Sequence, residues 1–132
     1  MKIGDCSTQR NLDETGREQA RQIGKLFKAQ GISVRQVFSS QWCRARETAR
    51  LAFPHVPTTD APAFNSFFQQ RDTEPQQTEA ARKQLLAWQG PGALVVFTHQ
   101  VNITALTGMT LSSGQGVVLR KSGSTLIVQG QI

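Results

Sequence analysis

Hydrophobic residues along this chain follow helix-like and strand-like spacing in alternation. Between Asp13 and Gly31 they recur every three or four residues, which is typical of an amphipathic helix with one buried face. Asp13 is a favourable N-cap for this helix, and Gly31 is a favourable terminator. Residues 32–38 then read as a strand, and a second helix with the same apolar spacing ends before Pro54.

The second half of the chain begins with a long connection. Residues 54–75 are rich in Pro, Thr and Asp, and we expect three phenylalanines to pin this segment to the core: Phe64, Phe67 and Phe68. A third helix is predicted to follow, with Thr73 and Gln76 as a capping pair around Pro75.

Strands and a short helix complete the predicted pattern. The uninterrupted apolar run at 93–97 predicts a strand buried on both faces of a parallel sheet. A short helix at 101–106 and a hairpin formed by 116–120 and 125–129 follow it. The sequence therefore predicts a single α/β domain over 1–132, with a mostly parallel sheet, helices on both faces and a C-terminal β-hairpin.

Charge is distributed unevenly along the chain. The net charge is +6, and the first 50 residues hold ten Lys or Arg against five Asp or Glu. This favours an anionic partner, a small phosphoester or a nucleic acid, with plain solubility as the alternative. Nucleic-acid binding is not expected, because the chain has no Tyr, no basic run and no zinc or base-stacking motif.

Targeting and redox features are sparse. No apolar run is long enough to span a membrane, and the N-terminus lacks an apolar leader. We therefore expect a cytoplasmic protein, or a periplasmic one if the N-terminus is truncated. Cys6 and Cys43 lack metal-ligand spacing; they could pair in an oxidising compartment and would stay free thiols in the cytosol. No metal or other cofactor is predicted.

Two turns from strand to helix carry polar chemistry. One contains Ser39, Ser40 and Arg44, and the other contains His99. In open α/β sheets, ligands bind at the carboxyl ends of the strands, so Arg44 and His99 are expected at one site. An Arg at a helix start is disfavoured by the helix dipole, and a bound anion would offset this; the alternative is that Arg44 only solvates the helix.

Three sequence blocks resemble the histidine phosphatase superfamily, also called phosphoglycerate mutase-like. They are residues 12–20, the Ser39-Ser40 pair followed by 44–49, and residues 95–99. The resemblance covers most of 5–120. It implies that Arg44 and His99 hold the oxygens of a phosphoryl group, without a metal, while another histidine attacks phosphorus.

The chain departs from the family pattern at the nucleophile. The family's Arg-His motif and its strand should precede Leu12, but residues 1–11 contain no histidine, and the chain has only His55 and His99. His55 is interpreted as a solvated loop residue. Arg10 is a candidate third phosphate contact. The family's proton donor has no clear counterpart, although Asp72 and Glu74 are nearest in position and Asp60 lies in the same region.

Three hypotheses follow from this pattern. The first is a truncated family member that keeps a phosphate pocket and is catalytically impaired. The second is an active phosphomonoesterase completed by another segment or subunit. The third is an interaction or oligomerisation module with a basic surface. The missing strand would lie beside the His99 strand, so we expect unpaired edges at Val37 and Val95, filled by rearrangement, by the hairpin or by a second copy in a dimer.

Overall fold

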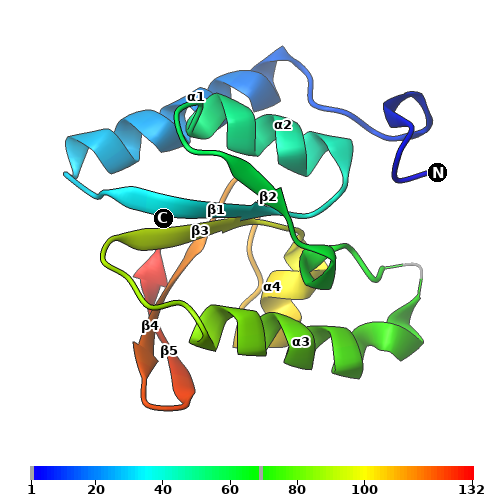
Figure 1. Ribbon diagram of the computed structural model, residues 1–132. Helices are drawn as coiled ribbons and strands as arrows, with labels where there is room; N and C mark the ends of the chain where they lie inside the picture. Colours follow the sequence, from blue (N-terminus) through cyan, green and yellow to red (C-terminus); the bar gives the residue numbers. More distant parts are fainter. Residues whose placement is uncertain (1, 69) are drawn as a thin grey trace.

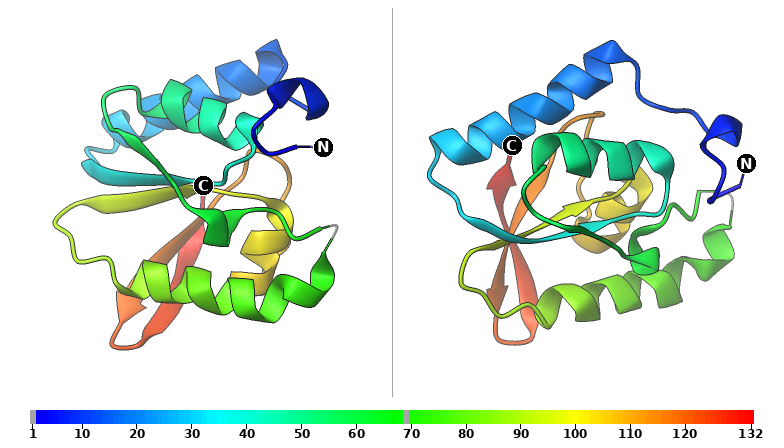
Figure 2. Two further views of the ribbon diagram at one scale, coloured as in Figure 1. Left: turned by 45° about the vertical axis from the view of Figure 1, so that its right-hand side comes forward. Right: turned by 45° about the horizontal axis from the view of Figure 1, so that its top comes forward.

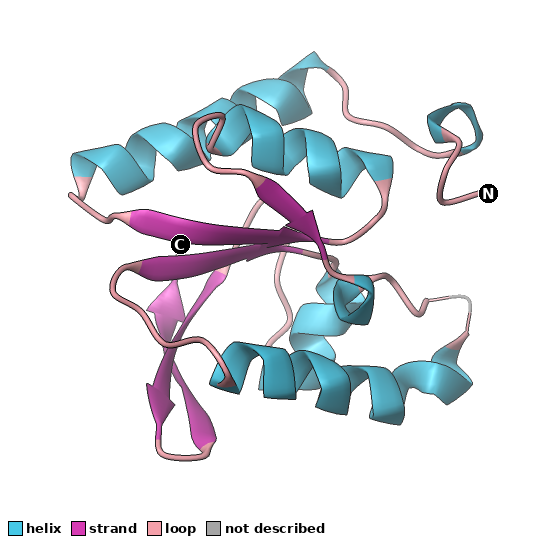
Figure 3. Ribbon diagram, in the orientation of Figure 1, coloured by secondary structure: helices cyan, strands magenta, loops and turns pink. Residues whose placement is uncertain are grey.

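The computed structural model describes residues 2–68 and 70–132 and has the predicted α/β architecture (Figures 1 and 3). One short 3-10 helix precedes α1, and two others lie in the connection that leads to α3. The regular elements in chain order are α1 (Glu14–Ala29), β1 (Val34–Ser39), α2 (Cys43–Ala52), β2 (Thr58–Asp60), α3 (Glu74–Leu86), β3 (Ala93–Phe97), α4 (Gln100–Thr107), β4 (Val117–Ser122) and β5 (Thr125–Gln131).

The main sheet has three parallel strands in the order β2-β1-β3, while β4 and β5 form a separate antiparallel hairpin. Helices α1 and α2 cover one face of the sheet and α3 and α4 cover the other (Figure 1). The predicted fold class is therefore confirmed, including helices on both faces and the C-terminal hairpin.

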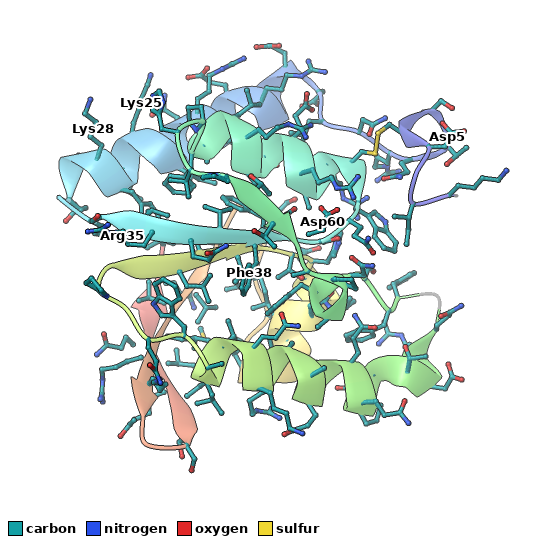
Figure 4. All side chains as sticks on the ribbon, in the orientation of Figure 1. Asp5, Lys25, Lys28, Arg35, Phe38 and Asp60 are labelled. Atoms are coloured by element: carbon teal, nitrogen blue, oxygen red, sulfur yellow. A yellow bond between two sulfur atoms is a disulfide. The ribbon has the colours of Figure 1, made fainter. Side chains whose placement is uncertain are left out.

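Alternation along the central strand divides the core into two layers. Val37 packs with Ala49, Ala52 and Phe53 on the side of α1 and α2. Phe38, the next residue, points to the opposite face and packs against the cluster that includes Phe64 (Figure 4). Successive side chains of a strand point to opposite faces, so one short apolar strand serves both layers.

The helix boundaries follow from local chemistry. The Asp13 carboxylate accepts a hydrogen bond from Gly16 N at 2.8 Å and caps α1, as predicted. Gly108 ends α4 with a φ of 75°, a conformation that glycine adopts without strain. At α3 the predicted capping pair is wrong, because the Thr73 hydroxyl donates to the Gln70 carbonyl instead of capping the helix.

The long connection differs from the prediction in two respects. It contains the short strand β2, which pairs with β1 and was not predicted because three polar residues carry no periodic signal. Phe64 and Phe67 are buried, but Phe68 is 62% exposed and lies under the guanidinium of Arg71, so only two of the three phenylalanines pin the segment.

The outer edge of β3 has no partner strand among the described residues. The expectation of two unpaired edges is wrong for Val37, because β1 is the central strand and Val37 pairs with both Thr58 and Val95. The hairpin does not fill the free edge, since β4 and β5 pair only with each other. All five residues of β3 are half-buried rather than buried.

Among the described residues, no helix is both long and apolar enough to cross a membrane.

Replacing Gly24 with alanine should destabilise the fold. A Cβ at Gly24 would lie 2.1 Å from the backbone oxygen of Ala52, so α1 and α2 would have to separate. Overpacking typically costs about 1–3 kcal/mol, and a clash with backbone is expected at or above the top of this range, which outweighs the gain of about 1 kcal/mol in helix propensity. Urea denaturation measures the change.

Gly16→Ala is the matched control in the same helix. Its new Cβ would meet the flexible side chain of Leu12 at 3.1 Å, which can move aside, so no loss of stability is expected. Equal stability of Gly24→Ala and the wild type would contradict the close packing of the two helices.

Candidate anion-binding site

The parallel pairing of β1 and β3 brings the two polar turns together. Ser39 lies opposite Phe97 in the register, and Ser40 N donates a hydrogen bond to the Phe97 carbonyl at 2.9 Å. Helix α2 begins three residues after Ser40, and α4 begins immediately after His99. Arg44 in the first turn of α2 therefore reaches the same sheet edge as His99.

A buried chain of hydrogen bonds fixes the imidazole of His99. Arg44 Nη2 lies 3.3 Å from His99 Nδ1, and Ser40 Oγ lies 2.8 Å from His99 Nε2. A guanidinium can only donate, so Nδ1 must be the acceptor. The neutral ring then carries its proton on Nε2 and donates it to Ser40 Oγ, which also accepts from Trp42 N at 3.1 Å. Both ring nitrogens are therefore engaged.

Burial keeps His99 neutral. The residue is 8% exposed. The imidazole of His99 and the ring of Trp42 contact each other in an edge-to-face arrangement, with ring centroids 5.4 Å apart. Removal from water, followed by repulsion from Arg44, lowers the pKa of His99 from 6.5 to about 4. His99 is therefore uncharged at neutral pH.

Two arginines converge on this site without a counter-ion. Burial lowers the pKa of Arg44, and repulsion from Arg10 lowers it further. Neither arginine forms an ion pair with any described residue, whereas Arg17, Arg21, Arg46 and Arg82 all do. The charges of Arg10 and Arg44 are therefore not neutralised by an ion pair within the described residues.

Arg10 reaches the site on the N-terminal segment. Residues 2–12 lie on the same side of the molecule as the carboxyl ends of β1 and β3 (Figure 2). A disulfide joins Cys6 to Cys43 at the start of α2, where it is visible as a yellow bond (Figure 4). Gln9 Oε1 also accepts a hydrogen bond from Cys43 N at 2.8 Å. Of the two cysteine states left open by the sequence, the structure contains the paired one.

These elements line a pocket of about 1260 Å³. Arg10, Arg44 and His99 are on its wall, and the exposed Phe68 belongs to its rim together with Trp42. The volume exceeds that needed for a phosphate ion, so the pocket has room for a phosphoester with a substantial leaving group.

Other predicted candidates lie away from this pocket. Asp72 and Glu74 are not among its lining residues; Asp72 is exposed and Glu74 begins α3. Asp60 binds Arg46 through two hydrogen bonds of 2.9 and 2.6 Å, so neither group is free to act in the pocket. His55 is exposed in the loop after α2, as predicted.

Glu47 does not pair with Arg44, its neighbour one helical turn away. Its carboxylate lies 3.6 Å from Arg17 Nε on α1 instead. This leaves the Arg44 guanidinium available to the pocket.

Sequence reasoning missed several residues that position the site. Asn65 accepts from Gln41 N at 2.7 Å and donates to the Gln41 side chain at 2.9 Å, which ties the loop before α3 to the Arg44 turn. Asn102 Nδ2 also donates to the Asn65 carbonyl at 2.8 Å. Gln41 and Asn65 lie in loops and Asn102 lies in α4, and a single amide carries no periodic signal, so only the spatial position of these residues reveals their role.

No metal site is evident in the part of the chain that the structure describes. No three His, Cys, Asp or Glu side chains there come close enough together to hold an ion.

Comparisons with known proteins concern the family and the fold of the chain. A sequence profile of the histidine phosphatase superfamily (branch 1) matches residues 6–68. This confirms the predicted resemblance to the histidine phosphatase superfamily. The matched region includes Arg10, Ser40 and Arg44, but not His99. A search of curated protein sequences found no significant match.

Solved structures of histidine phosphatases share the fold. A protein from Escherichia coli described as an alpha-ribazole-5'-P phosphatase superposes with a TM-score of 0.73 at 17% identity, over 91% of this chain and 82% of its own. The protein histidine phosphatase SixA, complexed with tungstate, gives 0.68 at 15% identity over 93% and 83%. A phosphoserine phosphatase variant from Entamoeba histolytica gives 0.70 at 10% identity over 92% and 83%.

We expect the fold to lose stability in acid because of His99. Its pKa of about 4 lies below the ordinary value of 6.5, so the folded chain binds fewer protons than the unfolded chain. The contribution of His99 is fully present above about pH 6.5 and is lost as the pH falls to about 4. The shift corresponds to about 3 kcal/mol of unfolding free energy, measurable by urea denaturation across this range.

The His99→Gln variant supplies the control. It lacks the titrating ring, so the decrease of its unfolding free energy over the same pH range should be about 3 kcal/mol smaller than that of the wild type. Parallel curves for the two proteins would contradict the lowered pKa of His99.

Proposed function

We propose that this chain binds phosphate or a small phosphoester in the pocket formed by Arg44, His99 and Arg10, and that it has little phosphatase activity of its own. The observation that carries the proposal is the contact between Arg44 Nη2 and His99 Nδ1 at 3.3 Å, with Arg10 on the same pocket wall and no ion pair from either arginine among the described residues. An anion placed among these groups would replace repulsion with attraction.

The donor chemistry suits a phosphoryl group. A guanidinium offers planar pairs of N–H donors that match phosphate oxygens, and a bond to a charged group is stronger than a neutral one. An anion entering between Arg44 and His99 would accept from Arg44 and favour protonation of His99 Nδ1. The ring then becomes a second charged donor, so binding and proton uptake are coupled.

Two of the structural relatives support this proposal. SixA was crystallised with tungstate, a tetrahedral oxyanion like phosphate. The Entamoeba histolytica phosphoserine phosphatase was solved with one histidine replaced by alanine and with phosphoserine bound. A phosphoester can therefore occupy this fold in a protein that has lost a histidine.

Impaired catalysis follows from the histidines available. The chain has only His55, which is exposed in a loop, and His99. A nucleophile needs a free lone pair aimed at phosphorus. The Nδ1 lone pair of His99 faces Arg44 and its Nε2–H faces Ser40, so His99 is arranged to hold a phosphoryl group rather than to attack it.

Calorimetric titration with inorganic phosphate and with tungstate tests the pocket. We expect binding to the wild type, a loss of about 10- to 100-fold for Arg44→Ala, and a loss of about tenfold for His99→Ala, because each removes one charged or polar donor. The matched control is Arg50→Ala, which removes the same charge from an exposed position on the same helix and should change affinity less than about twofold.

Absence of phosphate and tungstate binding by the wild type would contradict the proposed function. An equal loss in Arg44→Ala and Arg50→Ala would show that only net charge matters, which is the outcome expected of a basic interaction surface.

A phosphoenzyme assay tests the catalytic half of the proposal. After incubation with a labelled phosphodonor, the chain should form no acid-labile phosphohistidine, and phosphate release should remain close to background, because positioned charges alone give only residual rates. A phosphohistidine that disappears in His99→Ala but persists in His55→Ala would contradict the assignment of His99 as a phosphate ligand.

A second candidate function is favoured by the free edge of β3. The carboxyl end of β3 leads directly to His99, so a parallel strand added along this edge would end beside the pocket. Such a strand, carried by another segment or subunit, could bring a nucleophilic histidine and complete a phosphomonoesterase. In that case the label in the phosphoenzyme assay would appear on the added strand and not on this chain.

A further inference from the structure

The N-terminal segment carries one of the pocket arginines but has almost no packing of its own. Residues 2–8, 10 and 11 are exposed, and the short 3-10 helix at Cys6–Thr8 has no buried residue. Local hydrogen bonds make the segment compact: Asn11 Nδ2 donates to the Cys6 carbonyl at 2.8 Å, and Gln9 N donates to it at 3.1 Å. The residues on either side of Arg10, Gln9 and Asn11, are therefore both bonded to Cys6.

Two bonds link this segment to α2 among the described residues. They are the Cys6–Cys43 disulfide and the hydrogen bond from Cys43 N to Gln9 Oε1. Both end at Cys43, the residue immediately before Arg44. The covalent bond thus connects the segment that carries Arg10 to the first turn of the helix that carries Arg44.

We propose that the Cys6–Cys43 disulfide is a positioning device that holds Arg10 in the anion pocket, so that the redox state of this cysteine pair sets the anion affinity. The proposal rests on the proposed function, since it concerns the same pocket. Arg10 and Arg44 repel each other, so the N-terminal segment tends to move away from the pocket unless something holds it there. The disulfide opposes this repulsion, and a bound anion removes its cause.

The redox step requires a dithiol reductant. One thiolate of the reductant attacks a sulfur of the disulfide, the Cys6–Cys43 bond breaks, and a mixed disulfide forms. The second thiolate of the reductant then displaces the remaining cysteine. The protein gains two electrons and two protons and holds two free thiols, while the reductant becomes a cyclic disulfide.

The expected effect is partial because Arg44 and His99 remain in place. Releasing Arg10 removes one charged donor from the pocket formed by Arg10, Arg44 and His99, so phosphate affinity should fall about three- to tenfold. The oxidised and reduced forms of the protein therefore both contain the anion site and differ only in its affinity.

A thermodynamic cycle with two changes tests the proposal. Phosphate affinity is measured for the wild type and for Arg10→Ala, each oxidised and each reduced with dithiothreitol. We expect a loss of about three- to tenfold on reduction of the wild type, a similar loss in oxidised Arg10→Ala, and no further loss on reducing Arg10→Ala. Lys2→Ala is the matched control, since Lys2 is an exposed cation of the same segment that does not line the pocket; it should respond to reduction like the wild type.

Several outcomes would overturn the proposal. Equal phosphate affinity of the oxidised and reduced wild type would do so while leaving the proposed function intact. No phosphate binding by the oxidised wild type would contradict both this proposal and the proposed function. An undiminished loss on reducing Arg10→Ala would mean that the disulfide acts on the fold and not through Arg10.

A second variant keeps the test decisive if reduction unfolds the chain, as circular dichroism would reveal. Gln9→Ala removes the non-covalent link to Cys43 and keeps the disulfide. Oxidised Gln9→Ala should bind phosphate within about twofold of the wild type, because the covalent link still holds Arg10 in place. A loss as large as that of Arg10→Ala would show that Gln9, and not the disulfide, positions the arginine.

Discussion

The hydrogen bond from Ser40 N to the Phe97 carbonyl is the constraint on which the site depends. It extends the pairing of β1 and β3 by one step beyond the strands, just where each chain turns toward a helix. The Ser40 hydroxyl is thereby held beside the His99 ring, and α2 starts at the right place for Arg44 to reach the other ring nitrogen. Without this register, the serine, the histidine and the arginine would be separate surface residues.

Electrostatics in this region differ from those on the rest of the surface. Four arginines elsewhere bind carboxylates, and one of them, Arg46, contacts both carboxylate oxygens of Asp60. At the pocket, Arg10 and Arg44 are on the same wall, their repulsion lowers the pKa of Arg44, and the side chain that contacts Arg44 is a neutral histidine rather than a carboxylate. Such an arrangement lowers stability in the empty state, and it is retained in folded proteins mainly where binding compensates for it.

The sequence was informative where a residue's role depends on its place along one element. Helical spacing located α1 and α2, the Asp13 cap fixed the start of α1, and the two strand-to-helix turns placed Arg44 and His99 at one edge. It was less informative where partners lie far apart in the chain. The strand β2 consists of polar residues and forms because it pairs with the edge of β1. Glu47 forms an ion pair with Arg17 of another helix rather than with Arg44, which is nearer in the sequence. The pairing of Cys6 with Cys43 across 37 positions likewise depends on the folded path of α1 and β1.

The free edge of β3 has a consequence for the chain in solution. An apolar strand with unpaired backbone donors and acceptors can pair with the same strand of another copy, and β3 contains no lysine or proline of the kind that often prevents such contacts. The net charge of +6 keeps like-charged copies apart. Because dissolved salt shortens the range of this repulsion, contacts between copies at this edge are expected to depend on ionic strength.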